Sequence, residues 1–369
     1  MHQRPRVLLL IPHLGGGGAE RVTSQLTRGL PAQKYEIHLG LVTESIATPF
    51  TVPAGVEIHA LGARRVRTAA LALLRLVRML EPDLILSGMA HLNFLVLLLR
   101  PLLPRKTHIV IRQNSTASAD LDSGRIPVWT RMLYRLLYPS ADCIICQSQA
   151  MVDDLEDRVG VRDAHMLVLP NPVDVDAIRD LPSPVESHWS GPGPHLLAIG
   201  RLSPEKGFDL LLRAFTSLRI KFPSACLQVL GSGPELAALE KLRSELHLET
   251  SVSFAGYVPR PEEYFPGATL FVLPSRSEGL PNALLEAAAG GLPLVASPCS
   301  EGLVHLLRGK RGSWLAEDVT APALTRALLA ALGSIRPGQR FPHSWIESFY
   351  IDRAIRSYER LIDQTLRAR

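Results

Sequence analysis

Two basic residues follow a short apolar run in the second half of the chain, where they could hold an anionic ligand. The run ends at Gly200, and Arg201 and Lys206 come soon after it. An arginine offers a planar fork of hydrogen-bond donors and a lysine a compact positive charge, so together they suit a diphosphate. Surface cations beside a loop are commonly just solvated, so the functional interpretation depends on what lies further along.

Two glutamates lie further along, on either side of a predicted helix start. Glu278 falls in the short loop after an apolar run that ends at Pro274, and Glu286 stands eight positions later. Pro281 suits the first turn of a helix, and the N–H groups at a helix N-terminus favour phosphate. The two carboxylates could therefore meet one ligand at its two ends. The simpler alternative makes Glu278 a capping acid and Glu286 a solvated helix residue.

A run of four glycines, residues 15–18, follows the first apolar strand pattern of the chain and precedes a helical pattern. Glycines let the backbone turn tightly and approach a ligand closely, and the helix start offers free N–H groups to an anion. The run matches neither the dinucleotide-binding fingerprint nor a P-loop. By itself it is equally compatible with a plain flexible turn.

The elements that must position these residues alternate between short apolar runs and longer helical patterns, which indicates parallel sheets covered by helices on both faces. A chain of 369 residues exceeds the roughly 250 to 300 residues at which a single core stops growing, so two domains are expected. The predicted strands are 6–11, 36–42, 56–60, 83–87, 108–112 and 142–147, then 195–200, 226–230, 251–255, 269–273 and 292–296.

Both halves are predicted to be α/β, doubly wound and Rossmann-like. Helix-breaking prolines and glycines between residues 170 and 194 predict the hinge. We therefore expect an N-terminal domain over 1–180, a C-terminal domain over 181–345, and a last helix over 346–369 that crosses back to the first domain. Ligands bind such sheets at the carboxyl ends of the strands, which predicts two domains that face a central cleft.

The net charge of +5 is distributed unevenly. Residues 62–112 hold nine lysines and arginines against two acidic residues, whereas residues 136–180 hold three arginines against nine acidic residues. The segment 64–80 combines helical apolar spacing with arginines, which suits an anionic membrane surface or a phosphorylated acceptor. An ordinary solvated helix face explains the same pattern. Nucleic-acid binding is not expected, because no recognition module accompanies the charge.

The cysteine count and the hydropathy pattern predict a cytoplasmic protein. There are four cysteines and no secretory pattern, and the most apolar stretch, 92–99, is far shorter than the ~20 residues of a membrane span. Cys143 and Cys146 have no second pair of metal ligands and would point to opposite faces of a strand, so we expect buried, inert thiols. No histidine or acidic cluster shows metal-ligand spacing.

In this order and at these spacings, the motifs resemble those of the family-four retaining glycosyltransferases, whose GT-B architecture has two Rossmann-like domains. The similarity spans nearly the whole chain. It rests on Gly15–Gly18 with Ala19-Glu20-Arg21, on Gly200-Arg201-Leu202 with Glu205-Lys206-Gly207, on the segments 229–234 and 252–256, and on the pair Glu278 and Glu286.

The resemblance implies roles for particular residues. Arg201 and Lys206 match the basic pair that holds the donor diphosphate, Glu286 the acid that binds the ribose hydroxyls, and Glu278 the acid beside the donor sugar; Arg201, Lys206 and Glu278 are thus the catalytic candidates. The other donor-binding candidates are Gly16, Gly17, Gly18, Tyr257, Val258, Gly279, Leu280 and Pro281. The family needs no catalytic metal or cofactor, and its retaining route lets the departing phosphate take the acceptor proton.

The acceptor side departs from the family pattern. Many relatives carry a histidine after the strand that corresponds to 108–112, where this chain reads Arg112-Gln113-Asn114. Asn114 can bond a sugar hydroxyl but cannot act as a general base at neutral pH. Arg112, Asn114 and His91 are the acceptor-side candidates. His91 and His13 stand at predicted strand ends, where a structural role is the simpler interpretation.

The resemblance predicts a retaining, metal-independent enzyme that moves a hexose or N-acetylhexosamine from a UDP-linked donor to a saccharide acceptor. Its glycine motif is similar to that of bacterial enzymes of O-antigen, capsule or glycan assembly. The expected acceptor is therefore polyprenyl-diphosphate-linked, with peripheral contact at the inner face of the cytoplasmic membrane. The alternatives are a GDP-mannose-dependent mannosyltransferase, a catalytically silent nucleotide-sugar-binding scaffold, and a nucleotide-sugar epimerase.

Overall fold

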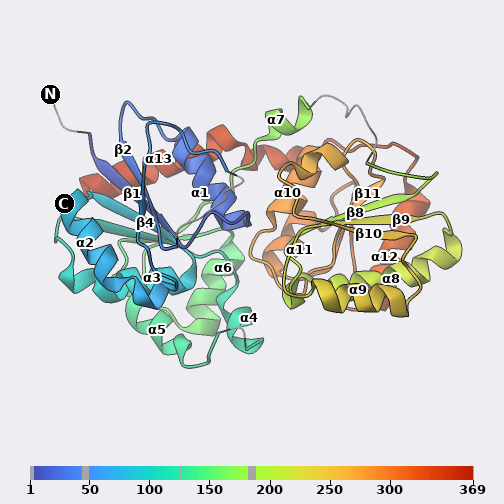
Figure 1. Cartoon of the computed structure of the whole chain (residues 1–369), viewed down its shortest axis with the longest axis horizontal. Helices are drawn as coiled ribbons and strands as arrows, with labels where there is room; N and C mark the ends of the chain where they lie inside the picture. Colours follow the sequence, from blue (N-terminus) through green and yellow to red (C-terminus); the bar gives the residue numbers. More distant parts are fainter. Residues whose placement is uncertain (1–3, 44–49, 125, 182–187, 369) are drawn as a thin grey trace. The chain divides into compact units, whose positions relative to one another are not determined.

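The computed structural model describes residues 4–43, 50–124, 126–181 and 188–368, and the chain forms two compact units (Figure 1). Unit 1 comprises Met1–Pro172 and Ile351–Arg369, and unit 2 comprises Val173–Tyr350. Each unit is a parallel sheet covered by helices on both faces, as the alternating pattern of the sequence predicts.

The sheet of unit 1 has seven strands in the order β3-β2-β1-β4-β5-β6-β7. The strands are β1 (Arg6–Ile11), β2 (Glu36–Leu41), β3 (Glu57–Ala60), β4 (Leu84–Gly88), β5 (His108–Arg112), β6 (Cys143–Cys146) and β7 (Met166–Val168). Six of them confirm predicted strands. The seventh, β7, was not predicted because three residues at the edge of a sheet are too few to show an apolar pattern.

Side chains of unit 1 alternate between two cores. Val7, Leu9 and Ile11 of β1 pack with helices α1 (Gly18–Gly29) and α13 (Ile351–Arg367), whereas Leu8 and Leu10 face the opposite core. The helices of that second face are α2 (Ala70–Leu80), α3 (Ala90–Leu99), α4 (Ala117–Asp122), α5 (Thr130–Leu137) and α6 (Gln149–Asp153), the last continued by a π-helix over Asp154–Val159. A parallel sheet buried on both faces explains why its strands read as continuous apolar runs.

The sheet of unit 2 has six strands in the order β10-β9-β8-β11-β12-β13. The strands are β8 (His195–Ile199), β9 (Cys226–Leu230), β10 (Val252–Gly256), β11 (Leu270–Leu273), β12 (Leu294–Ala296) and β13 (Ser313–Leu315). One core contains α8 (Phe208–Lys221), α9 (Leu236–Glu245) and α12 (Ala321–Ser334), and the other contains α7 (Val175–Arg179), α10 (Asn282–Ala289) and α11 (Glu301–Leu307). The three-residue edge strand β13 was not predicted, for the same reason as β7.

The chain passes between the units at Pro172–Val173 and returns at Tyr350–Ile351, rather than at 180–181 and 345–346. Val173 and Val175 are buried in a core of unit 2, and the N–H of Val173 donates to the carbonyl oxygen of Phe349 at 2.8 Å. The last helical segment is divided at Tyr350, whose ψ of 133° is not helical, into a 3-10 turn over Ser344–Phe349 and the long helix α13. α13 belongs to unit 1, where it packs beside α1.

The arginine-rich segment 64–80 has its apolar face covered. Leu73, Leu76 and Val77 of α2 are buried in the core of unit 1, while Arg75 and Arg78 are exposed. The stripe of Leu73, Leu76 and Val77 is therefore not available to a membrane, whereas Leu71 and Met79 of the same helix are 69% and 66% exposed. No helix within the described ranges has the length and apolar content that crossing a bilayer requires.

The two cysteines of β6 lie as predicted. Cys143 packs in one core of unit 1 and Cys146 in the other, and both are buried. Burial raises the pKa of each thiol to about 12. Both thiols are therefore protonated and unreactive at neutral pH.

Candidate active site

Arg201, Lys206 and Glu278 of unit 2 lie in loops next to the point where the strand order reverses. β8 and β11 are neighbours in the sheet, although β9 and β10 lie between them in the sequence. The loop after β8 carries Arg201 and Lys206, and the loop after β11 carries Glu278. Such a switch point, outside the carboxyl ends of parallel strands, is where open α/β sheets bind ligands.

Lys206 and Glu278 form an ion pair across these two loops. The Lys206 Nζ donates to Glu278 Oε1 at 2.6 Å, and the hydroxyl of Ser275 donates to the same oxygen at 2.7 Å. The side chains of Lys206 and Glu278 are 25% and 10% exposed. An ammonium has three donors, and Glu278 engages one of them, so Lys206 can still donate to a ligand. Sequence reasoning missed Ser275, which shows no signal apart from its place in the loop.

A third strand end brings a thiol to this pair. Cys299 follows β12 and lies next to the helix start of α11. Burial, with a further contribution from the Glu278 carboxylate, raises the pKa of the Cys299 thiol, while Lys206 opposes that shift. Cys299 is thus a neutral neighbour of the ion pair and no nucleophile at neutral pH.

Glycines let the loops approach one another. Gly207 has a φ of +65°, and a Cβ atom there would lie 2.1 Å from the carbonyl oxygen of Pro274. In the loop after β9, a Cβ on Gly231 would lie 1.9 Å from the carbonyl oxygen of Gly200. No side chain fits at these distances, so glycine is required where the loops of β8, β9 and β11 touch.

An exposed arginine ties the loop after β11 to the start of α8. Both terminal nitrogens of Arg276 donate to the carboxylate of Asp209 at 2.7 Å, and one also donates to the carbonyl oxygen of Pro204. Burial alone would raise the pKa of Asp209, but Arg276 holds it below its usual value. Neither residue was predicted to matter, because their separation of 67 positions gives no local signal. Arg276 is a positioning residue for the loop that carries Glu278.

The remaining donor-side candidates of unit 2 surround the start of α10. Gly279, Leu280 and Pro281 are buried just before the helix, whose N-terminus has no side-chain cap. Helix N–H groups without a side-chain cap offer donors to an anion. Glu286, the fifth residue of α10, is only 8% exposed, which excludes the solvated-helix alternative. Arg201 is exposed in the loop that follows β8.

Tyr257 and Val258 lie at the same edge of the sheet. They follow the edge strand β10, and the carbonyl oxygen of Gly256 accepts a hydrogen bond from the N–H of Gly231 at 2.7 Å. Tyr257 is 40% exposed, while Val258 packs against the core that contains α10. An exposed ring at the carboxyl end of a strand is accessible to a planar ligand group.

In unit 1 the glycine run joins β1 to α1. Gly16 has a φ of +97°, and Gly17 caps the helix without a side chain. The carboxylate of Glu20 folds back onto this loop: its Oε2 atom lies 2.4 Å from where a Cβ on Gly17 would be. Glu20 is 4% exposed and pairs with His13 at 3.3 Å. The loop therefore carries its own buried acid, which sequence reasoning treated only as part of the motif.

His91 and His13 are brought close together because β1 and β4 are neighbouring strands. His91 is exposed in the first turn of α3, which follows β4. Partial desolvation of the ring, followed by the nearby charge of His13, lowers the pKa of His91. His91 is therefore neutral at pH 7 and can accept or donate a hydrogen bond at this edge of unit 1.

Arg112 does not reach the surface, and its expected acceptor role needs correction. It is 2% exposed, and its guanidinium donates to the hydroxyl of Tyr358 at 3.1 Å and to the side-chain oxygens of Asn114 and Asn171. A guanidinium with these enclosed partners holds segments of the chain together rather than contacting a substrate. Arg112 thereby joins β5 to the segment before the boundary and to the returning helix α13.

Asn114 is left with a single orientation. Its side-chain oxygen accepts from Arg112 and from Gln147, whereas its Nδ2 group is buried without a hydrogen-bond partner among the described residues. Nδ2 lies beside Gly88 at the carboxyl end of β4. Arg112 therefore fixes the orientation of the Asn114 amide, whose Nδ2 group is turned toward the carboxyl end of β4.

Comparisons with known proteins show which family of proteins has this fold and these motifs. The family model described as "Glycosyltransferase Family 4" matches residues 16–177, and the model "Glycosyl transferases group 1" matches residues 193–334. The sucrose-phosphate synthase of Thermosynechococcus elongatus aligns with a TM-score of 0.83 at 18% identity, over 99% of this chain and all of that one. Anabaena HepE in complex with UDP aligns with a TM-score of 0.74 at 16% identity, over 97% of this chain and all of that one. Both likenesses show the fold.

Among curated relatives, an uncharacterized glycosyltransferase of Haemophilus influenzae is 37% identical over 136 residues, which are 36% of this chain and 38% of the relative. An N-acetylgalactosamine-N,N'-diacetylbacillosaminyl-diphospho-undecaprenol 4-alpha-N-acetylgalactosaminyltransferase of Campylobacter jejuni is 28% identical over 81% of this chain and 82% of the relative. The match spans 38% and 60% of the first two relatives' lengths. The chain belongs to the family-four glycosyltransferases and has the GT-B fold.

Proposed function

We propose that the protein is a retaining, metal-independent transferase that moves a hexose or N-acetylhexosamine from a UDP-linked donor to a saccharide acceptor. The observation that carries this proposal is the ion pair of Lys206 and Glu278 at the switch point of unit 2, beside the start of α10. A cation, a carboxylate and helix N–H groups at one switch point would suit a sugar diphosphate. The fold neighbour with bound UDP supports the choice of nucleotide.

The charges explain how this chain would promote transfer. Breaking the bond between sugar and phosphate leaves negative charge on the departing diphosphate, and Arg201 and Lys206 stabilise that charge as it develops. Glu278 holds the Lys206 ammonium in place before the donor binds. Because the ion pair is neutral as a unit, exposed Arg201 supplies the net positive charge of the loop. Glu286, nearly buried on α10, accepts hydrogen bonds from the ribose.

We place the acceptor on a lipid carrier at the cytoplasmic face of a membrane. The Campylobacter relative is named for a diphospho-undecaprenol substrate. Unit 1 also exposes apolar side chains on and just before α5, where Trp129, Met132 and Leu136 are 66%, 58% and 67% exposed. Their spacing puts them on one stripe of a helix, and such a stripe suits an interface with lipid. Asn114 and His91 are the residues offered to the saccharide.

A GDP-mannose donor is the second candidate. A GDP-mannose-dependent phosphatidylinositol monomannoside mannosyltransferase of Mycolicibacterium smegmatis is 32% identical over 172 residues, 42% of this chain and 45% of the relative. The ion pair at the switch point could bind either nucleotide, because it would contact the diphosphate rather than the base.

The donor and the reaction are tested together. Purified protein in EDTA is incubated with a panel of UDP-sugars and GDP-sugars and a bacterial membrane lipid extract, and nucleotide release and product mass are followed. We expect release of UDP and the addition of one sugar to a lipid-linked glycan. Glu286→Ala should abolish the product, whereas Glu240→Ala, which removes an exposed glutamate of α9, should leave it unchanged.

The other outcomes separate the alternatives. Release of GDP with transfer of mannose identifies the second donor, and a free, altered sugar nucleotide identifies an epimerase. Loss of all product in EDTA that added metal restores contradicts the metal-independent route. If no donor reacts with the extract or with a panel of defined saccharide acceptors while one raises the melting temperature, the protein is a binding scaffold.

A further inference from the structure

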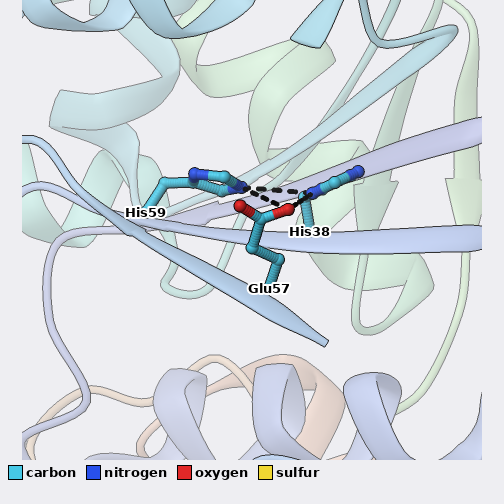
Figure 2. A group of neighbouring side chains, drawn as sticks. All are labelled: His38, Glu57 and His59. Carbon is cyan, nitrogen blue, oxygen red and sulfur yellow. Dashed lines mark hydrogen bonds and ion pairs between the residues drawn. The ribbon is translucent and has the colours of Figure 1, made fainter. Parts of the chain in front are cut away.

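A cluster of metal-ligating side chains lies away from the loops of the candidate active site, on strands β2 and β3 of unit 1. The parallel register pairs His38 of β2 with Glu57 of β3, and His59 stands two residues further along β3. Residues two apart on a strand, and paired residues of neighbouring strands, project from the same face. Figure 2 shows the two imidazole rings and the carboxylate pointing toward one another.

The three ligand atoms are spaced as the ligands of one ion. His38 Nδ1 lies 3.1 Å from His59 Nε2 and 3.5 Å from Glu57 Oε2, and His59 Nε2 lies 3.8 Å from Glu57 Oε2. The centre of a triangle with these sides is about 2.0 Å from each corner, close to the ~2.0–2.2 Å of zinc–nitrogen and zinc–oxygen bonds. Among the residues that the structure describes, this is the cluster of three or more such side chains that could hold an ion.

The cluster has an outer partner that orients His38. Nε2 of His38 lies 3.1 Å from Oε1 of Glu36, and the other oxygen of that carboxylate is 3.5 Å from Nε of Arg6. A proton on Nε2 donated to Glu36 leaves the lone pair of Nδ1 directed at His59 and Glu57. Histidine ligands of metals are typically held by a carboxylate in this way, which fixes the ring and its tautomer.

Burial and charge also favour a cation here. His38 is 3% exposed, while the side chain of Glu57 is 67% exposed and leaves the cluster open to solvent. Two imidazoles and one carboxylate suit zinc, whereas magnesium and calcium prefer oxygen ligands alone.

We propose that His38 Nδ1, His59 Nε2 and Glu57 Oε2 bind one zinc-like divalent cation, with water in the fourth position. The ion would link β3, an exposed edge strand, to β2. The ligands are strand residues rather than loop residues at the carboxyl ends, so this is a stabilising site and it is independent of glycosyl transfer. The expectation that the chain lacks a metal-ligating cluster came from sequence spacing, which does not show that β2 and β3 pair.

The test uses the full chain after removal of metal with EDTA and dialysis into chelator-free buffer. Co²⁺ is titrated and followed by its visible absorption, and Zn²⁺ is titrated against a chromophoric chelator. We expect one equivalent per chain, with micromolar or tighter affinity, strong absorption bands typical of tetrahedral Co²⁺, and a melting temperature that rises with zinc concentration.

Variants connect the binding to these residues. His59→Gln and Glu57→Gln should each weaken zinc binding, and Glu36→Gln should weaken it by the roughly 10- to 100-fold typical of an outer partner. His305→Gln, which removes an exposed histidine of α11 in unit 2, should bind as the unchanged protein does. Because the Glu57 side chain is largely exposed, its variant should fold even if His59→Gln does not.

Two results would overturn the proposal. One is no bound equivalent at ~100 µM free zinc, well above the concentrations at which built zinc sites fill. The other is equal affinity in the unchanged protein and in Glu57→Gln and His59→Gln, because the bound ion would then lie elsewhere. In either case the contact between His38 and His59 is only a hydrogen bond between the two rings.

Discussion

Removing the charge of Lys206 should weaken nucleotide binding chiefly through the glutamate that it leaves behind. In the unchanged protein the Lys206 ammonium lies 2.6 Å from Glu278 Oε1, and the Glu278 side chain is 10% exposed. Lys206→Met keeps the length of the side chain but removes its charge. Glu278 then faces the diphosphate as a mostly buried carboxylate that has lost the positive charge of Lys206.

The size of the effect follows from the geometry. If a phosphate oxygen lies ~2.8 Å from Lys206 Nζ, as in a charge-assisted hydrogen bond, it lies within about 5 Å of the Glu278 oxygen. Two unit charges ~5 Å apart at an effective dielectric constant of ~20 repel by about 3 kcal/mol. The lost hydrogen bond adds roughly 2 kcal/mol. Lys206→Met should therefore weaken UDP binding by roughly 1,000-fold or more.

A second substitution separates the two contributions. Lys206→Met with Glu278→Gln removes the repulsion and leaves only the lost hydrogen bond, so the double variant should bind UDP roughly 100-fold more tightly than Lys206→Met alone. Binding is measured by calorimetry at pH 7.5, with melting temperatures as a check on folding. The corresponding changes at Lys241 and Glu245, an exposed ion pair of 3.8 Å on α9, should alter nothing.

The comparison can refute the reasoning. If the double variant binds UDP as weakly as Lys206→Met, the charge of Glu278 does not affect diphosphate binding and the ion pair is only structural. If Lys206→Met binds UDP as the unchanged protein does, the basic loop after β8 is not the diphosphate site.

Two further predictions concern unit 1. The double variant Trp129→Ser with Met132→Ser should reduce cosedimentation with anionic liposomes at low salt several-fold. The control variant Ile220→Ser, which alters a side chain of α8 that is 85% exposed, should not reduce it. Equal sedimentation of the two variants would contradict the membrane proposal. Asp142→Asn should destabilise the fold by roughly 1–3 kcal/mol at pH 7, because Arg100 donates to the carboxylate at 2.8 Å and keeps its pKa below the usual value although burial opposes this. A lowered pKa stabilises the fold above the unfolded-state value of 3.8, and this contribution is lost as the pH falls through the lower pKa of the folded state. The difference in melting temperature should therefore shrink as the pH falls below 3.8, and a constant difference would contradict the assignment.

Much of the fold is present in local sequence patterns. Eleven predicted strands correspond to strands of the structure, because apolar runs of four or more residues between helical patterns are a local signal. β7 and β13 have three residues each and lie at sheet edges, where no local signal distinguishes them from loops. The boundary at Pro172–Val173 was also not readable, because it depends on which core Val173 and Val175 enter.

The types of charged residue on the donor side could likewise be predicted from the sequence. Arg201, Lys206 and Glu278 each follow a predicted strand, and strand ends of a parallel sheet share one edge. Their pairing required the strand order, since only the adjacency of β8 and β11 places Lys206 against Glu278. Ser275 carried no sequence signal at all.

The sequence by itself determined the alternation of strands and helices, the glycine turns and the types of charged residue at the strand ends. The tertiary structure decided which of these residues meet. It buried Arg112, which the sequence offered to an acceptor, and it assembled His38, Glu57 and His59, to which no sequence spacing had pointed. The physical reason is the same in each case. Burial and contact between residues far apart in the chain depend on which strands pair and on which face each side chain lies, and the local sequence does not contain that information.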